Sequence, residues 1–266
     1  MALTYVISYP KSGATWFRLL MYALFHQKLD NSNEVQLFYP ELPNQEDLVL
    51  RNLEEGGDFF IKNHVAFSED LKFLEQATRI IYISRNPFNC MLSKLDHYKY
   101  EGVNWVSKDD GFVKFCTDFM DNASKPPSQT SDKLHGGWNY HIQSWFNAQL
   151  EIPVINIRYE DLAEDTVTAL QKLSDEVGWN FNHEAIEKAV ELASFNRIMS
   201  MEMHELTNKV PGMFYSEKRR KAFMEDNSMR FVKLGKKRDA IRILPVEMIL
   251  RGKIVFYEGM QIAGYR

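Results

Sequence analysis

The chain has little cysteine: Cys90 and Cys116 are the only two among its 266 residues. Two cysteines cannot build a disulfide framework, and they do not show the spacing of a zinc-binding pattern. No apolar run approaches the roughly 18 residues that a membrane-spanning helix requires. An apolar run starts within the first few residues, so we also expect no signal peptide. These absences predict a cytoplasmic protein that is neither secreted nor anchored in a membrane.

The chain also lacks a large excess of charge of either sign. Its 32 basic and 36 acidic residues give a formal net charge of −4, which argues against a nucleic-acid partner bound by general electrostatics. Apolar residues make up 45% of the chain and charged residues 26%, which is enough for a substantial core. We expect a single domain over residues 1–266.

Short apolar runs alternate with segments of helical periodicity. The first expected helix covers 17–25, and the expected strands cover 3–7, 79–84 and 152–158. Strands that alternate with helices predict an α/β fold in which helices flank a central parallel sheet. Trp138 and Trp145 recur at helical spacing and are expected to pack in the core.

The segment 8–16, Ser-Tyr-Pro-Lys-Ser-Gly-Ala-Thr-Trp, connects the first expected strand to the first expected helix. Backbone N–H groups at a helix N-terminus favour an anion, Gly13 permits close approach, and Lys11 adds a full positive charge. The segment is therefore predicted to bind phosphate. An ordinary strand-to-helix turn with a capping serine remains the alternative.

The segment differs from a P-loop. That pattern requires G-x-x-x-x-G-K-[ST], in which the lysine follows the second glycine and a hydroxyl binds magnesium. Here Lys11 precedes Gly13, and no G-K-[ST] occurs in the chain. The departure argues against a magnesium-dependent kinase or NTPase.

A second basic position lies at the end of the strand 79–84. Arg85 follows this strand, Pro87 fits the first turn of a new helix, and Ser93 lies about two turns along it. A guanidinium and a hydroxyl at this spacing can bind a second phosphate, because arginine forms a bidentate fork. A surface salt bridge is the alternative for Arg85 alone.

Between these positions, a short strand ends in Lys62-Asn63-His64. Histidine suits a general base because its ordinary pKa lies near physiological pH. His64 follows a strand at the sheet edge where ligands of open α/β folds bind. We expect it to be the catalytic base; a structural histidine is the alternative.

These segments resemble the sulfotransferases that use 3′-phosphoadenosine 5′-phosphosulfate (PAPS). Their first loop usually has the sequence Y-P-K-S-G-T-T-W, from which this chain departs only at Ala14. The family motifs R-N-P-x-D-x-x-x-S and K-T-H match here with Asn89 and Asn63 as substitutions. The resemblance implies a P-loop-like sulfotransferase fold, with the 3′-phosphate on Arg85 and Ser93. It places the 5′-phosphosulfate on the loop residues Lys11, Ser12, Gly13, Ala14, Thr15 and Trp16, of which Trp16 stacks on the purine.

Further segments extend the resemblance. Tyr159 begins a Y-E-D motif and would contact the adenine. Ser194 and Phe195 match T-S-F-x-x-M, and they would also approach the adenine. The family's F-x-R-K-G clamp over the 3′-phosphate matches in degraded form, with lysine for arginine and leucine for lysine, at Lys233, Leu234 and Gly235. Because lysine gives a point charge without a fork, this clamp is expected to be weaker.

The resemblance implies transfer of the sulfuryl group from PAPS to a small-molecule acceptor, through a hydroxyl or an amine or amide nitrogen. His64 would act as the base and Lys11 would stabilise the leaving adenosine 3′,5′-bisphosphate (PAP). Lys62 would assist the sulfuryl oxygens, and Ser93 is placed among the catalytic residues. No metal, nucleic acid or membrane is expected to take part.

Two other functions remain open, a P-loop-type nucleotide kinase and a non-catalytic nucleotide-binding module. The acidic segment 30–58 lacks clear periodicity and forms either part of the acceptor pocket or its lid, or a solvated surface loop. The family's dimerisation motif, K-x-x-x-T-V-x-x-x-E, loses its lysine, threonine and glutamate in the stretch 241–250. The oligomeric state and the acceptor therefore stay open.

Overall fold

A computed structural model describes residues 2–100, 103, 110–131, 133–227, 230–232 and 240–265, without the side chains at 99, 100 and 241. Within these residues a four-stranded sheet has the order β2-β1-β3-β4. Its strands are β1 (Ala2–Ser8), β2 (Asp58–Asn63), β3 (Ala77–Ser84) and β4 (Val154–Arg158). β1 pairs in parallel with β3, and β3 pairs in parallel with β4. The predicted α/β fold with a central parallel sheet is confirmed.

The central strands are apolar because both of their faces are covered. Tyr5, Ile7, Ile81 and Ile83 have no more than 1% of their surface exposed. Near-continuous β-branched and aromatic runs are typical of parallel strands buried on both faces. The strand pattern in the sequence therefore had a clear physical cause.

Helices occupy most of the remaining described chain. From the N-terminal side they are α1 (Ala14–His26), α2 (Ser32–Phe38), α3 (Glu46–Glu55), α4 (Pro87–Tyr100), α5 (Gly111–Asp121) and α6 (Trp138–Phe146). The next are α7 (Tyr159–Glu164), α8 (Thr166–Glu176), α9 (His183–Leu192), α10 (Phe195–Asn208), α11 (Glu217–Glu225), α12 (Val246–Val255) and α13 (Tyr257–Ile262). Short 3₁₀ turns lie at η2 (Pro127–Gln129) and η3 (Ala240–Arg242).

The segment 30–58, which showed no periodicity, contains two helices. α2 begins after Asn31, whose Oδ1 accepts the backbone N–H of Glu34 at 3.0 Å. Such a cap stabilises the start of a short helix. The alternative of a plain surface loop is therefore wrong for this segment, whose two helices are too short to show a clear repeat.

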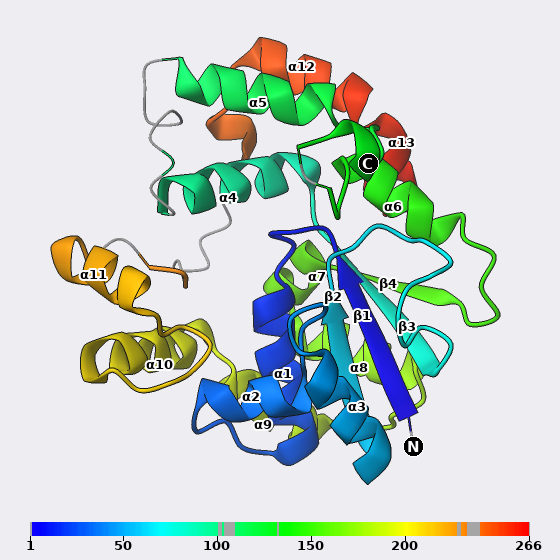
Figure 1. Ribbon diagram of the computed structural model, residues 1–266, viewed down its shortest axis with the longest axis vertical. Coiled ribbons are helices and arrows are strands. Elements are labelled where there is room, and N and C mark those ends of the chain that lie inside the picture. Colours follow the sequence, from blue (N-terminus) through cyan, green and yellow to red (C-terminus); the bar gives the residue numbers. More distant parts are fainter. Residues whose placement is uncertain are drawn as a thin grey trace. The chain divides into compact units, whose positions relative to one another are not determined.

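The chain divides into two compact units. Unit 1 contains Gly13–Lys62 and Asp161–Lys237, and unit 2 contains Ala2–Ser12, Asn63–Glu160 and Arg238–Arg266. In unit 1, α1 packs against α2 and α9. In unit 2, α6 packs against α13, and α5 runs beside α4 and α12 (Figure 1). A single domain over 1–266 stays a prediction.

Each unit has its own aromatic core. In unit 1, Phe25 lies 5.1 Å from Phe60 and 5.2 Å from Trp179 between ring centroids. In unit 2, Trp138 and Trp145 have 1% and 0% of their surface exposed. Both tryptophans pack in the core as predicted.

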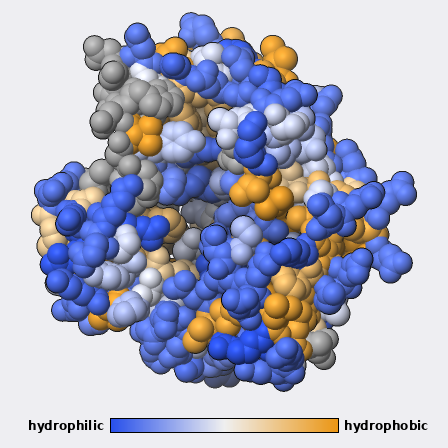
Figure 2. Space-filling view, in the orientation of Figure 1, coloured by the Kyte–Doolittle hydropathy of each residue, from blue (hydrophilic) through white to orange (hydrophobic). Residues whose placement is uncertain are grey.

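The face of the molecule in Figure 2 is mostly hydrophilic, with separate patches of apolar residues. Scattered exposed apolar side chains are normal for a folded protein. Among the residues that the structure describes, no helix is long and apolar enough to cross a membrane.

Candidate functional site

The turn between β1 and α1 has an unusual backbone. Lys11 has φ 73° and Gly13 has φ 94°, both in the left-handed region. This region is strained for lysine, and such strain is often kept at functional sites. Within the described residues no side chain caps α1 at Gly13. A helix that begins without a capping side chain on its N-cap residue leaves room for an anion at its N-terminus.

The other predicted loop residues lie at the start of α1 or just before it. Ala14, Thr15 and Trp16 form its first turn. Ser12 is fully buried, and its hydroxyl lies 3.5 Å from the sulfur of Cys90. The Ser12 hydroxyl therefore lies in the interior, next to the Cys90 sulfur.

In unit 2, Arg85 contacts two other predicted site residues, Lys11 and Tyr159. Its Nη1 donates to the carbonyl of Lys11 at 2.8 Å, and its guanidinium carbon lies 4.3 Å from the ring centroid of Tyr159. Burial raises the pKa of Tyr159, and the positive charge of Arg85 opposes this rise. Ser93 is half-buried on α4.

One donor of Arg85 is unsatisfied. Its Nε is buried and has no hydrogen-bond partner in the described part of the chain. A buried unpaired donor costs free energy, and on a cation an anionic oxygen is its best acceptor. Arg85 is thus oriented by Lys11 and Tyr159 while it retains a donor for a ligand.

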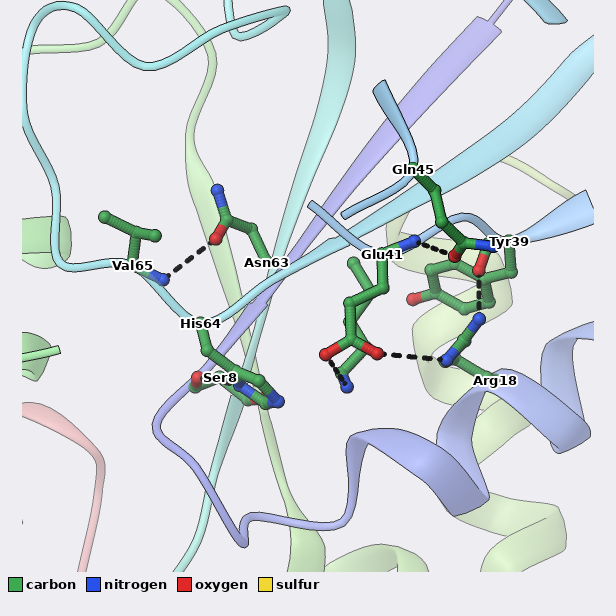
Figure 3. Close-up of polar contacts among 9 residues, drawn as sticks. Ser8, Arg18, Tyr39, Glu41, Gln45, Asn63, His64 and Val65 are labelled. Atoms are coloured by element: carbon green, nitrogen blue, oxygen red, sulfur yellow. Dashed lines mark hydrogen bonds and ion pairs between the residues drawn. The ribbon is translucent and has the colours of Figure 1, made fainter. Parts of the chain in front are cut away.

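His64 follows β2 and contacts the end of β1 (Figure 3). Its Nδ1 lies 2.7 Å from the carbonyl oxygen of Ser8. A carbonyl only accepts, so Nδ1 carries the proton of the neutral ring and donates it. Nε2 is then the basic nitrogen, which suits a proton acceptor.

A second histidine, which sequence reasoning did not assign to the site, fixes the backbone of His64. His141 on α6 is fully buried, and its Nε2 donates to the carbonyl of His64 at 2.9 Å. Its Nδ1 then accepts from the hydroxyl of Tyr82 at 2.8 Å. The sequence gives no signal for this role, because a histidine on a helix carries no local information about a distant backbone partner.

In unit 1, Lys62 is buried in an ion-pair cluster. Its Nζ lies 2.7 Å from Glu41, whose other carboxylate oxygen lies 3.5 Å from Arg18. Arg18 also donates to the carbonyl of Tyr39, and Figure 3 shows Glu41 directed toward Arg18. Burial lowers the pKa of Lys62 to about 8, and the charge of Glu41 opposes this lowering. The sequence pattern identified Lys62 but neither of these partners.

Three of the four residues predicted to contact adenine come together in unit 1, whereas Tyr159 lies in unit 2. The rings of Trp16 and Phe195 lie 4.9 Å apart at 33°, and Trp16 Nε1 donates to the carbonyl of Ala193 at 3.0 Å. Ser194 lies between these contacts as the N-cap residue of α10. Trp16 therefore packs on the start of α10, where Ser194 and Phe195 lie.

Two predictions concern residues and groups outside these clusters. Lys233, Leu234 and Gly235 lie outside the described residues. No group of three or more His, Cys, Asp or Glu in the described ranges has the arrangement of a metal site.

Comparisons with known proteins agree with these motifs. The model of the sulfotransferase domain family matches residues 4–233. The chain belongs to the sulfotransferase family. Sulfotransferase 1A1 of Bos taurus is 24% identical over 215 residues, which cover 76% of this chain and 67% of that protein. The chain spans about two thirds of the length of the curated relatives it matches.

Solved structures share the fold. Retinol dehydratase in complex with androsterone and the inactive cofactor PAP aligns with a TM-score of 0.67 and 14% identity, over 99% of this chain and 82% of that chain. Mouse sulfotransferase SULT7A1 complexed with PAP aligns with a TM-score of 0.65 and 20% identity, over 98% of this chain and 85% of that chain. The resemblance to PAPS-dependent sulfotransferases is thereby confirmed at the level of family and fold.

Proposed function

We propose that the protein transfers the sulfuryl group of PAPS to a small-molecule acceptor and releases PAP. The observation that carries the proposal is Arg85, a half-buried side chain oriented by Lys11 and Tyr159 whose buried Nε has no partner in the described part of the chain. The PAP in the two structural neighbours supports the same choice of ligand.

The binding residues of the donor nucleotide are assigned separately for its 3′-phosphate, its 5′-phosphosulfate and its adenine. Its 3′-phosphate is assigned to Arg85 and Ser93, with Lys233, Leu234 and Gly235 as the clamp. Its 5′-phosphosulfate is assigned to the loop from Lys11 to Trp16. There the backbone of Lys11 and Gly13 is in the left-handed region, and α1 begins without a capping side chain at Gly13. The adenine is assigned to Tyr159, Ser194, Phe195 and Trp16.

The reaction needs a base and groups that stabilise developing charge. His64 Nε2 removes the acceptor proton, while Nδ1–H remains hydrogen-bonded to Ser8. The acceptor oxygen or nitrogen then attacks sulfur, and the bond from sulfur to the bridging phosphate oxygen breaks. Lys11 stabilises the negative charge on the departing PAP, and Lys62 assists the sulfuryl oxygens. The reaction requires no metal in this scheme.

A small organic acceptor suits the proposal, because one neighbour holds androsterone, a molecule of that size class. Either a hydroxyl or a nitrogen acceptor satisfies the proton transfer to His64. A cytoplasmic location stays a prediction.

Radiolabelled PAPS and a panel of phenols, steroid alcohols and amines test the proposal. Wild-type protein should label at least one acceptor. His64→Ala should lower turnover about a hundredfold or more while PAP affinity stays within about twofold. His183→Ala, which removes a histidine from the exposed side of α9, is the matched control. Near-normal turnover of His64→Ala would refute the role of His64 as base.

A thermal-shift comparison tests the donor itself. A ligand that binds only the folded state raises the melting temperature. PAP should therefore stabilise the protein more than ATP with magnesium at the same concentration. The reverse order would favour a nucleotide kinase, and stabilisation by PAP without transfer to any acceptor would favour a nucleotide-binding module.

A further inference from the structure

In unit 2, the segment Ala263–Tyr265 lies against the residues that end β4. Asn156 Nδ2 donates to the carbonyl of Ala263 at 3.0 Å, and Arg158 Nη1 donates to the carbonyl of Gly264 at 2.7 Å. The guanidinium carbon of Arg158 lies 5.6 Å from the ring centroid of Tyr265. Alternate residues of a strand share one face, so Asn156 and Arg158 bind successive carbonyls of this segment.

Two residues after β4, at the start of α7, Glu160 contacts the same segment. Its Oε2 accepts the hydroxyl of Tyr265 at 2.6 Å, and its Oε1 accepts the backbone N–H of Asn86 at 3.1 Å and Asn89 Nδ2 at 3.3 Å. Tyr265 has only 8% of its surface exposed. A carboxylate has room for about four donors on its two oxygens, so all three bonds fit together. Hydrogen bonds to an ionised acceptor are also stronger than neutral ones.

The hydrogen bonds from Asn86 and Asn89 to Glu160 hold the turn that contains Arg85. Asn86 is the residue after Arg85, and its Oδ1 accepts the N–H of Phe88 at 3.0 Å at the start of α4. Tyr159, the residue before Glu160, packs its ring 4.3 Å from the guanidinium carbon of Arg85. Two consecutive residues at the start of α7 therefore fix two consecutive residues of the turn.

We propose that Glu160, held by the hydroxyl of Tyr265, is a positioning residue for Arg85 and thereby for recognition of the 3′-phosphate of the donor nucleotide. This inference rests on the proposed function, because it assigns the ligand of Arg85 as that phosphate. Without the Tyr265 hydroxyl, the carboxylate of Glu160 loses its fixed direction and the turn at Asn86 loosens. The guanidinium of Arg85 is then no longer pre-organised, and ordering it on binding lowers the affinity for the ligand.

Isothermal titration of PAP and of adenosine 5′-phosphate separates positioning from general stability. The two ligands differ only in the 3′-phosphate, so the ratio of their Kd values isolates that group. Tyr265→Phe should weaken PAP binding about tenfold, the loss expected for one charge-assisted hydrogen bond, and leave adenosine 5′-phosphate within about twofold. Tyr257→Phe removes the same atom from a tyrosine that is 61% exposed and should change neither Kd.

An unchanged Kd ratio in Tyr265→Phe, or an equal weakening of both ligands, would overturn the positioning role alone. If wild-type protein does not distinguish PAP from adenosine 5′-phosphate, the proposed function fails as well. Should Tyr265→Phe unfold at the assay temperature, Glu160→Gln decides by the same ratio, because glutamine keeps the shape and one acceptor oxygen. An unchanged ratio in that variant overturns the role equally.

Discussion

Replacing Lys62 by methionine should change how the free energy of unfolding depends on pH. Burial lowers the pKa of Lys62 from its ordinary value of 10.5 to about 8, even though Glu41 lies 2.7 Å away. Between these two pH values, the unfolded chain binds a proton that the folded chain has lost. The free energy of unfolding contributed by Lys62 therefore increases as pH rises through this window.

The magnitude follows from the two pKa values. A pKa difference from about 8 to 10.5 corresponds to about 3 kcal/mol. Below pH 8 both states carry the charge, so the folded state bears the whole cost of burying it. Methionine is of similar length and has no charge, so it removes this cost. The unfolding free energy of the wild type, minus that of Lys62→Met, should rise by about 3 kcal/mol between pH 7 and pH 10.5.

Urea unfolding followed by tryptophan fluorescence at pH 7, 8, 9, 10 and 10.5 measures this difference. Taking the difference matters because burial raises the pKa of other groups, such as Tyr5 to about 12, and their effect at high pH cancels between the two proteins. Lys28→Met is the control, since Lys28 is 51% exposed in its ion pair with Glu34. A difference between wild type and Lys62→Met that stays constant across the series would refute the reasoning.

Three further predictions concern other contacts. Trp16→Ala should weaken PAP binding about tenfold by titration calorimetry, because base stacking contributes about 1–3 kcal/mol, and Trp16→Phe should restore part of it. Tyr82→Phe leaves buried His141 without its hydroxyl partner and should lower the unfolding free energy in urea by about 1–3 kcal/mol. Gly212→Ala places a Cβ 2.4 Å from the carboxylate carbon of Glu205, so the unfolding free energy measured in urea should fall by about 1–3 kcal/mol. For Tyr82→Phe and for Gly212→Ala, an unchanged unfolding midpoint would contradict the contact on which the prediction depends.

Part of the candidate site was predictable because parallel strands end at one edge of a sheet. Lys11, Arg85 and Tyr159 lie far apart in the sequence. Each comes within three residues of the end of a strand of unit 2, which is β1, β3 or β4 respectively. Their motifs therefore predicted a shared location before any contact was known. The contacts of Arg85 with Lys11 and Tyr159 confirm that they come together.

The residues that sequence reasoning missed act through tertiary contacts. Glu41 reaches Lys62 from a segment without clear periodicity, and His141 reaches the backbone of His64 from a helix. No local pattern encodes the partner of a side chain across 21 or 77 positions. The helix α2 was different, because Asn31 followed by Glu34 is a capping signal that was present in the sequence.

A half-buried carboxylate in unit 2 and a buried one in unit 1 hold backbone N–H groups next to predicted ligand-binding segments. Glu160 binds the N–H of Asn86 beside Arg85. Glu202 binds the N–H groups of Phe231 and Val232, at 2.6 and 2.8 Å, just before the predicted clamp. A buried carboxylate is costly unless it is hydrogen-bonded, so folding favours the loop conformations that supply these donors. Acidic side chains in this protein therefore shape the segments predicted to bind a polyanion, although they repel it by charge.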